Sequence, residues 1–381
     1  MKITGYRIRY AKHYLFVEID TDEGITGLGE AGNWTFLKPT AEAIREMCDF
    51  MIGKDPSRIE DWNQNFYRAQ YFRGSVVMSA ISAIDIALWD IKGKRLGVPV
   101  YELLGGKVRD KVRCYASPMH IVEGDEELKA SYRELKDQGF TAAKIFVNGP
   151  ISSPDGKGEF HASRIHEEAR KVALVREAVG DDFDLVLEVH RGMDKAQAIA
   201  FGREVEKYHP MVLRDPVPPD NYDTMAEVAS KVAIPIATGE RFISLGEFEA
   251  ILSRHAACYV RPDVCAIGGI TTAKKVAALA EAHDVLIIPH NPLGPVSSAA
   301  CLQICACTPN LAIQELPGFC LNGKEDAMVD RPIRFSQGFI EIPDAPGIGL
   351  SLSPDAEELY PAVCRGGMAA RRSCDGAVKN W

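Results

Sequence analysis

Ionisable residues recur at nearly equal intervals through the second half of the sequence. The successive members are 26, 26, 23, 27 and 25 residues apart, and in order they are Glu188, Arg214, Glu240, Asp263, His290 and Glu315. Each follows a short apolar run, and each interval is close to the length of one strand with its following helix. Carboxylates and imidazoles gathered in one place can transfer protons or bind a cation.

A second histidine lies two residues after the first carboxylate of this series. Glu188 and His190 belong to the segment LEVHR, and side chains two apart on a strand point to the same side. A single ionisable residue at a strand end is most often a solvated or hydrogen-bonded loop residue. Six consecutive strand ends with ionisable residues make that interpretation improbable, because buried charges require partners.

The elements that must position these residues are eight short apolar runs that alternate with amphipathic segments such as 163–179 and 270–283. The predicted strands are 112–116, 142–147, 184–189, 211–214, 234–238, 257–261, 285–289 and 311–314. Eight strands, each followed by a helix, favour a closed parallel (β/α) barrel, in which catalytic groups project from the C-terminal ends of strands. An open α/β sheet is the alternative. However, the string GxGxxG occurs only at 27–32, within the predicted hairpins and outside any strand–helix–strand unit, and GxxxxGK[ST] does not occur, so nucleotide binding is not supported.

A smaller α+β unit precedes the barrel. Residues 1–35 alternate as hairpins around the turn Asp22-Glu23-Gly24, and helical patterns follow at 39–52 and 76–96. The second helix is predicted to present one apolar face, which comprises Met78, Ile81, Ile84, Leu88 and Ile91. We therefore expect a capping domain at 1–110 and a barrel at 111–334, with a late hairpin near 336–350 that brings residues 335–381 back to the capping domain.

Composition excludes several classes of function. The 381 residues carry 44 Lys and Arg against 53 Asp and Glu, a net charge of −9, so we expect no nucleic-acid partner. The ten cysteines include no CxxC pair of the zinc type. The N-terminus lacks a hydrophobic signal core, and no apolar run is long enough to cross a bilayer. We expect a cytoplasmic protein that does not associate with membranes.

Several longer motifs resemble the enolase superfamily. They are RGSVVMSAISAIDIALWDIKGKRLGVPVYELLGG (73–106), TGER (238–241), RPDVCAIGGIT (261–271), IPHNPLGPVSSAACLQ (288–303) and AIQE (312–315). With the ligand spacing, they make the chain similar to the mandelate racemase subgroup, and most similar to its D-galactonate dehydratase-like members. The resemblance implies an α/β, two-domain enolase-like fold: an α+β capping domain on a modified (β/α)7β TIM barrel.

The resemblance also implies a reaction. In this family three carboxylates on adjacent strands hold Mg²⁺, which stabilises the enediolate formed when an α-proton leaves a carboxylate substrate. His290, oriented by Asp263, corresponds to the base, His190 to the acid that protonates the departing β-hydroxyl, and Glu315 to the group that binds the substrate carboxylate. These roles imply dehydration of a sugar acid to a 2-keto-3-deoxy acid. Epimerisation or cycloisomerisation through the same enediolate is the alternative.

Further residues correspond to substrate contacts in this architecture. Lys144 and Asn148 lie near the end of the second predicted strand, where relatives bind substrate, although a racemase would show a Lys-x-Lys pair there. The capping segments 13–35 and 66–76 contain Trp34, Tyr71 and Arg73 as candidate contacts, with interdomain packing as an equally good interpretation. A Gly-, Pro- and Ser-rich stretch at 148–164 is a candidate lid. We expect a small-molecule carboxylate as substrate and a homo-oligomer.

The metal site departs from the family pattern. Glu240 is a conventional ligand and Glu188 replaces the usual Asp, but Arg214 stands where relatives have a glutamate, and arginine cannot bind Mg²⁺. Asp215 is predicted to point to the opposite face of its strand. Two carboxylates with one guanidinium carry the same formal charge as three carboxylates with Mg²⁺, so Arg214 could replace the ion. A non-catalytic descendant without metal is the remaining alternative.

Overall fold

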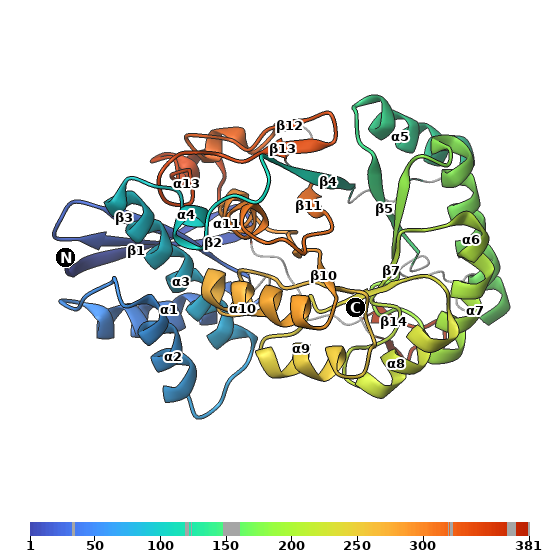
Figure 1. The fold of residues 1–381 in the computed structure, drawn as a ribbon, viewed down its shortest axis with the longest axis horizontal. Coiled ribbons are helices and arrows are strands. Elements are labelled where there is room, and N and C mark those ends of the chain that lie inside the picture. Colours follow the sequence, from blue (N-terminus) through green and yellow to red (C-terminus); the bar gives the residue numbers. More distant parts are fainter. Residues whose placement is uncertain are drawn as a thin grey trace.

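The computed structural model describes residues 1–32, 35–118, 122, 124–147, 161–318, 320, 323–363 and 371–379. An N-terminal unit of one sheet and three helices packs beside a barrel of parallel strands ringed by helices (Figure 1). The two-domain enolase-like fold expected from the sequence is confirmed.

The N-terminal sheet is an antiparallel meander of β1 (Ile3–Ala11), β2 (Tyr14–Thr21) and β3 (Thr26–Ala31) in that order. Helices α1 (Leu37–Met51) and α3 (Ser75–Leu96) confirm the two helices predicted here. Helix α2 (Ile59–Ala69) was not predicted from the sequence, and it buries Ile59, Trp62 and Phe66 along one side.

The five residues predicted to share one apolar face of α3 are all buried, and in the middle of the helix the burial extends to the other faces as well. One side lies against β3 so closely that a Cβ at Gly29 would sit 1.8 Å from the Ala83 carbonyl oxygen. On another side Trp89 donates a hydrogen bond of 2.9 Å to Thr271 of α10 (Gly269–Ala282) in the barrel. A helix that is apolar all round is expected where it is enclosed by other elements.

The barrel consists of eight parallel strands that close into a ring. They are β4 (Lys111–Ser117), β5 (Ala142–Phe146), β6 (Asp184–Glu188), β7 (Val212–Arg214), β8 (Ile236–Thr238), β9 (Tyr259–Val260), β10 (Leu286–Ile287) and β11 (Gln314–Pro317). Neighbours pair in sequence order from β4 to β10, and β11 pairs with β4. A bridge between Ile287 and Leu311 joins the remaining seam. The closed barrel is thus observed, and the open sheet is excluded.

The strands are filled from inside and covered from outside. The barrel is a packed core, because its interior holds one residue from each of β4 to β8 together with the residue after β10 and the residue before β11. They are Tyr115, Ala142, Val186, Val212, Ala237, Ile288 and Ile313. Together with α10, the surrounding helices are α5 (Asp125–Asp137), α6 (His161–Val179), α7 (Lys195–Val205), α8 (Tyr222–Lys231), α9 (Leu245–Leu252) and α11 (Pro295–Ala306), and the short α4 (Val100–Leu103) precedes the barrel.

The late hairpin differs from its prediction. Strands β12 (Phe335–Ser336) and β13 (Phe339–Glu341) form it, and β13 pairs antiparallel with β4, so it extends the barrel sheet instead of joining the capping domain. The chain reaches the N-terminal unit just after the hairpin, where the Ile348 N–H donates to Asp90 of α3. The remaining elements are η1 (Glu206–Tyr208), η2 (Asp326–Met328), α13 (Ala356–Leu359), β14 (Arg371–Arg372) and β15 (Val378–Lys379).

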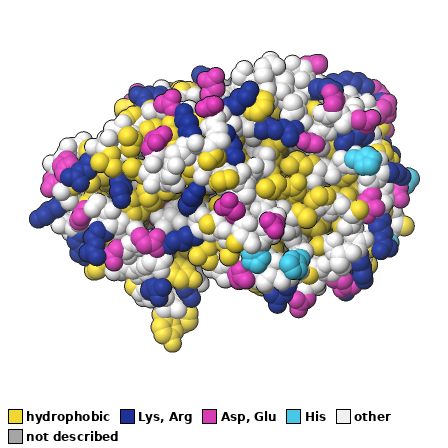
Figure 2. All heavy atoms as spheres, in the orientation of Figure 1, with side chains coloured by type: hydrophobic (Ala, Val, Ile, Leu, Met, Phe, Trp, Pro, Cys, Tyr) yellow, Lys and Arg dark blue, Asp and Glu magenta, His cyan; other side chains and the backbone are white. Residues whose placement is uncertain are grey.

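The surface carries both signs of charge. Basic and acidic side chains alternate over the face shown in Figure 2, and that face has no extended basic region. Among the described helices, none combines the length and apolar character needed to cross a bilayer.

Candidate active site

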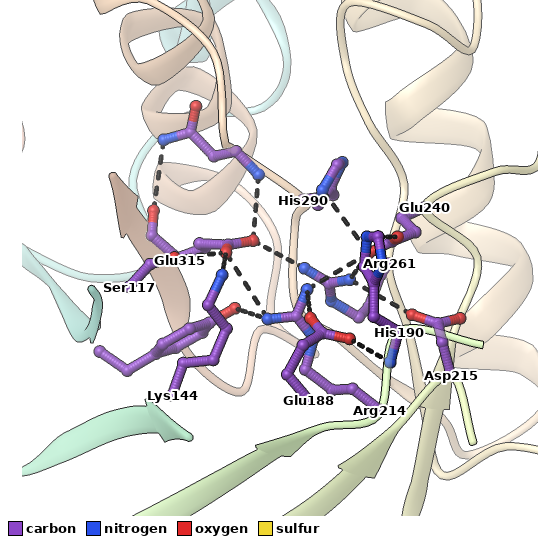
Figure 3. A network of polar contacts seen from close by, with 12 residues as sticks. Ser117, Lys144, Glu188, His190, Arg214, Asp215, Glu240, Arg261, His290 and Glu315 are labelled. Carbon is purple, nitrogen blue, oxygen red and sulfur yellow. Dashed lines mark hydrogen bonds and ion pairs between the residues drawn. The ribbon is translucent and has the colours of Figure 1, made fainter. Parts of the chain in front are cut away.

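The strand-end residues predicted from the sequence meet in one buried polar cluster (Figure 3). The cluster lies where barrel strands end, because Glu188 and Arg214 are the last residues of β6 and β7, and Glu240 follows β8 by two residues. Register explains the meeting, since Glu188 is directly opposite Arg214 in the β6–β7 ladder.

Arg214 lies between the carboxylates. Its Nη2 is 2.8 Å from Glu188 Oε2 and 3.3 Å from Glu240 Oε2. Its Nη1 is 3.5 Å from Glu315 Oε1 and donates a hydrogen bond of 3.1 Å to Tyr115 Oη. The residue is 1% exposed. Its two terminal nitrogens contact protein groups, whereas its buried Nε has no hydrogen-bond partner among the described residues.

A second arginine, Arg261, was missed by the sequence analysis. It follows β9 and is fully buried, with Nη1 2.6 Å from Glu240 Oε2 and Nη2 2.6 Å from Glu315 Oε2. Its place at a strand end in RPDV, two residues before Asp263, was the available signal. The two arginines together contact all three glutamates.

His190 and Arg191 lie beside the same cluster in left-handed conformations, with φ of 53° and 62°. Arg191 Nη1 is 2.5 Å and His190 Nε2 is 3.8 Å from Glu240 Oε1, and the His190 N–H donates to Glu188 Oε1. Burial lowers the pKa of His190 to about 4, because desolvation outweighs the nearby carboxylates. His190 is therefore neutral in the resting site at neutral pH.

His290 and Asp263 form a hydrogen-bonded pair. His290 Nδ1 is 2.8 Å from Asp263 Oδ2, and the Asp263 Oδ1 atom accepts the Cys265 N–H. A carboxylate at Nδ1 favours the tautomer in which Nε2 carries the lone pair. That Nε2 lies 3.6 Å from Glu240 Oε2, so His190 and His290 approach opposite oxygens of one carboxylate.

Glu315 also binds groups from the first two barrel strands. Lys144 Nζ lies 3.3 Å from its Oε1, and Ser117 Oγ donates to the same atom over 3.0 Å. Burial opposes the charge, but Arg214, Lys144 and Arg261 outweigh it and hold the pKa of Glu315 well below its usual range. Burial lowers the pKa of Lys144, although Glu315 opposes that shift.

Asp215 points into the cluster, contrary to the strand-alternation prediction. Its φ of 42° is left-handed, so the alternation of side chains ends at Arg214. Asp215 Oδ1 accepts a hydrogen bond from Thr238, whereas the buried Oδ2 has no hydrogen-bond partner and is 3.7 Å from Arg261 Nη1. Burial, followed by the charges of Glu240 and Glu188, raises the pKa of Asp215 to about 7.

The cluster contains a candidate cation site, and its carboxylates also form the ion pairs described above. Within the described parts of the chain, Glu188, Asp215 and Glu240 each offer a carboxylate oxygen within 4.8 Å of the others. Mg²⁺ requires such oxygens at about 2.0–2.1 Å in octahedral geometry. However, Arg214 Nη2 already contacts Glu188 and Glu240, and both Glu240 oxygens pair with arginines. In this arrangement the carboxylates do not fit the ion.

Of the remaining predicted contacts, the two that the structure describes, Arg73 and Tyr71, do not join the cluster. Arg73 is exposed and stacks on Tyr67 of α2, with 4.2 Å between guanidinium carbon and ring centroid. Tyr71 is 91% exposed, and its ring packs edge-on against Phe72. Trp34, Asn148 and most of the candidate lid at 148–164 lie outside the described residues, while 161–164 begin α6.

Comparisons with known proteins agree with this architecture. Residues 5–105 match the mandelate racemase / muconate lactonizing enzyme N-terminal domain, and residues 127–356 match the enolase C-terminal domain-like family. A D-galactonate dehydratase of Ralstonia pickettii (strain 12J) is 38% identical over 100% of this chain and 99% of its own length. A D-galactonate dehydratase of Pectobacterium atrosepticum is 36% identical over the same shares.

Solved structures show the same relationship. A crystal structure of mandelate racemase/muconate lactonizing enzyme from Jannaschia sp. CCS1 superposes with a TM-score of 0.86 at 32% identity, over 94% of this chain and 97% of that one. A member of the enolase superfamily from Salmonella Typhimurium gives 0.88 at 31% identity, over 94% and 98%. The chain thus belongs to the mandelate racemase and muconate lactonizing enzyme group of the enolase superfamily.

Proposed function

We propose that this protein is a carbon–oxygen lyase that dehydrates a small sugar acid to a 2-keto-3-deoxy acid. The observation that carries the proposal is the placement of His290 and His190 on opposite oxygens of Glu240, with His290 held by Asp263. Relatives that match the full chain are named D-galactonate dehydratase, which supports a hydroxylated carboxylate as substrate.

His290 is the proposed base. With Nδ1 bound to Asp263, its Nε2 accepts the proton from the carbon next to the substrate carboxylate, and the imidazolium formed is stabilised by Asp263. The enediolate then carries charge that protein cations must stabilise. Arg191 and Arg261 are the cations paired with Glu240 beside the two histidines.

His190 is the proposed acid for the second step. It transfers a proton to the β-hydroxyl as the C–O bond breaks, and the resulting enol tautomerises to the 2-keto-3-deoxy acid. Because burial keeps His190 neutral in the resting site, the step requires that an approaching anionic substrate raises its pKa. Lys144 is proposed to bind the substrate carboxylate, and Glu315 to hold Lys144 in position.

The test is proton NMR of the purified protein in D₂O with a library of acid sugars that includes D-galactonate. We expect a 2-keto-3-deoxy product, and we expect His290→Asn to lower its rate by about 10²–10⁴-fold, the usual contribution of a general base. His283→Asn is the matched control and should retain the rate, because His283 lies at the C-terminal end of α10 and pairs with Glu249, outside the cluster. Deuterium incorporation at C2 without product would indicate an epimerase, and an inert but ligand-binding protein would indicate a non-catalytic descendant.

We also propose the finer organisation expected from the sequence. A domain boundary near residue 110 is supported by β4, which begins the barrel at Lys111. A reducing, cytoplasmic location is supported by the nine described cysteines, which are all free. A homo-oligomer is supported by the exposed Tyr71 and Phe72, and light scattering coupled to size-exclusion chromatography would measure it.

A further inference from the structure

We infer that Arg214 and Arg261 together take the place of a divalent cation, so that this protein binds no divalent cation among Glu188, Asp215 and Glu240. The inference concerns what holds the carboxylates together. It does not depend on the reaction proposed above, because it is tested by metal binding.

Contacts give the first argument. Arg214 bridges Glu188 and Glu240, and Arg261 bridges Glu240 and Glu315. Three carboxylates from three strand ends are therefore tied together through nitrogen atoms at 2.6–3.3 Å, as a shared ion would tie them through coordination. Arginine suits this role because its planar fork offers several donors and its charge persists at all physiological pH values.

Charge gives the second argument. Four carboxylates lie in the cluster with four cations, namely Glu188, Asp215, Glu240 and Glu315 with Lys144, Arg191, Arg214 and Arg261. Counted as ionised, and with the Asp263–His290 pair left out of the count, these eight groups have a formal sum of zero. A dication would add two positive charges to buried groups that are already balanced, and excess buried charge is strongly unfavourable.

The same count predicts how to restore a cation site. Replacing Arg214 by glutamate removes one positive charge and adds one negative charge, so the formal sum falls to −2. One dication neutralises that sum. The new side chain would start from the end of β7, directly opposite Glu188 in the ladder, with Glu240 on the neighbouring side.

The experiment compares divalent-cation binding by the whole protein after dialysis against EDTA. Titration with MnCl₂, followed by electron paramagnetic resonance and by thermal unfolding with MgCl₂, is applied to wild type and Arg214→Glu. We expect no stoichiometric site in the wild type, and in Arg214→Glu one Mn²⁺ per chain with at least about tenfold tighter binding, which is the effect of about 1.4 kcal/mol. Mg²⁺ should raise the unfolding midpoint of Arg214→Glu alone.

Two control variants separate the site from general charge effects. Arg254→Glu makes the same charge change at an exposed arginine paired with Asp223, and it should bind no better than wild type. Arg214→Gln changes the sum to only −1 and supplies an amide where a carboxylate is needed, so its gain should be small.

Several outcomes would overturn the inference. The inference is wrong if each wild-type chain binds one Mn²⁺ tightly. It is also wrong if Arg214→Glu folds but binds no Mn²⁺. If Arg214→Glu fails to fold, metal analysis of untreated wild type decides the question alone. If the wild type binds no metal and also shows no dehydration, the proposed function is wrong and the inference about metal binding stands.

Discussion

At the scale of single residues, His190 and His290 share Glu240 but differ in their support. His290 Nδ1 lies 2.8 Å from Asp263 Oδ2, whereas His190 lies beside Arg191 and is kept neutral by burial. A base needs a stable protonated form after it acts, which Asp263 provides. The two histidines are therefore suited to successive steps.

This difference predicts that His190→Asn separates the steps. Because His190 acts on the leaving hydroxyl, its loss should abolish product while His290 continues to exchange the α-proton. Deuterium exchange at C2 and product formation, followed by NMR in the same sample, measure the two steps. His209→Asn is the control, since His209 is an exposed left-handed histidine outside the cluster. An equal loss of exchange and product would assign His190 to the proton abstraction itself.

Sequence reasoning at this scale succeeded where regular strands hold the residues. The pairing of Arg214 with Glu188 and Glu240 followed from charge and from one residue per strand end, and the structure shows it. Asp215 was misjudged because strand alternation does not extend past a residue with φ of 42°. Arg261 was overlooked because its burial depends on Glu240 and Glu315, which are distant in sequence.

At the scale of elements, the start of α10 is fastened to α3 and α2. Asp85 of α3 accepts the Thr271 N–H, and Asn63 of α2 donates to both Asp85 and the Gly268 carbonyl. N–H groups in the first turn of a helix have no partner within the helix. Asp85, which belongs to α3, accepts one such N–H from the first turn of α10. Gly269 permits this approach, because a Cβ there would lie 2.2 Å from Asp85 Oδ1.

We predict that Gly269→Ala destabilises the protein more than Gly53→Ala. Both glycines have left-handed φ, of 78° and 76°, so both variants incur a similar conformational cost of about 1–2 kcal/mol. A Cβ at Gly53 meets no atom within 4 Å, whereas at Gly269 it overlaps Asp85. Urea unfolding of the two variants measures the difference, and equal losses would show that the fastening adjusts without cost.

The sequence predicted these elements but not the elements that pack against them. The α3 periodicity indicated a helix correctly, but its all-round burial depends on β3 and α10 packing against it, which no local pattern reports. The late hairpin was recognised by its alternation. Its partner, β4, is more than 200 residues away in sequence and could not be read from the hairpin itself.

At the scale of the whole molecule, a buried carboxylate joins the two units. Glu30 of β3 accepts the N–H groups of Gly294 and Ser297 at the start of α11, at 2.7 and 2.8 Å. Burial raises the pKa of Glu30 to about 8, with smaller contributions from Asp263 and Glu325, while the two N–H groups oppose the shift. The folded protein therefore holds a proton on Glu30 that the unfolded chain releases near its usual value of 4.5.

This pKa predicts that stability falls as pH rises from about 5 to 8. In that range the folded state binds more protons at Glu30 than the unfolded state does, so the free energy of unfolding decreases with pH. The contribution amounts to at most about 4 kcal/mol over three pH units. Glu30→Gln should flatten the dependence in chemical denaturation at several pH values. An unchanged slope would assign the dependence to other groups, such as the buried Asp85, whose pKa is about 7.

The pairing of β11 with β4 has a consequence for synthesis on the ribosome. Gln314 lies beside Cys114, so the ring closes between segments 200 residues apart, and a nascent chain that ends before Pro317 has an open barrel. The same late strand carries Glu315, the partner of Arg214, Arg261 and Lys144. Closure of the sheet and neutralisation of its buried cations thus occur together at the end of barrel synthesis, and until then the chain presents unpaired strand edges and uncompensated charge that chaperones would have to shield.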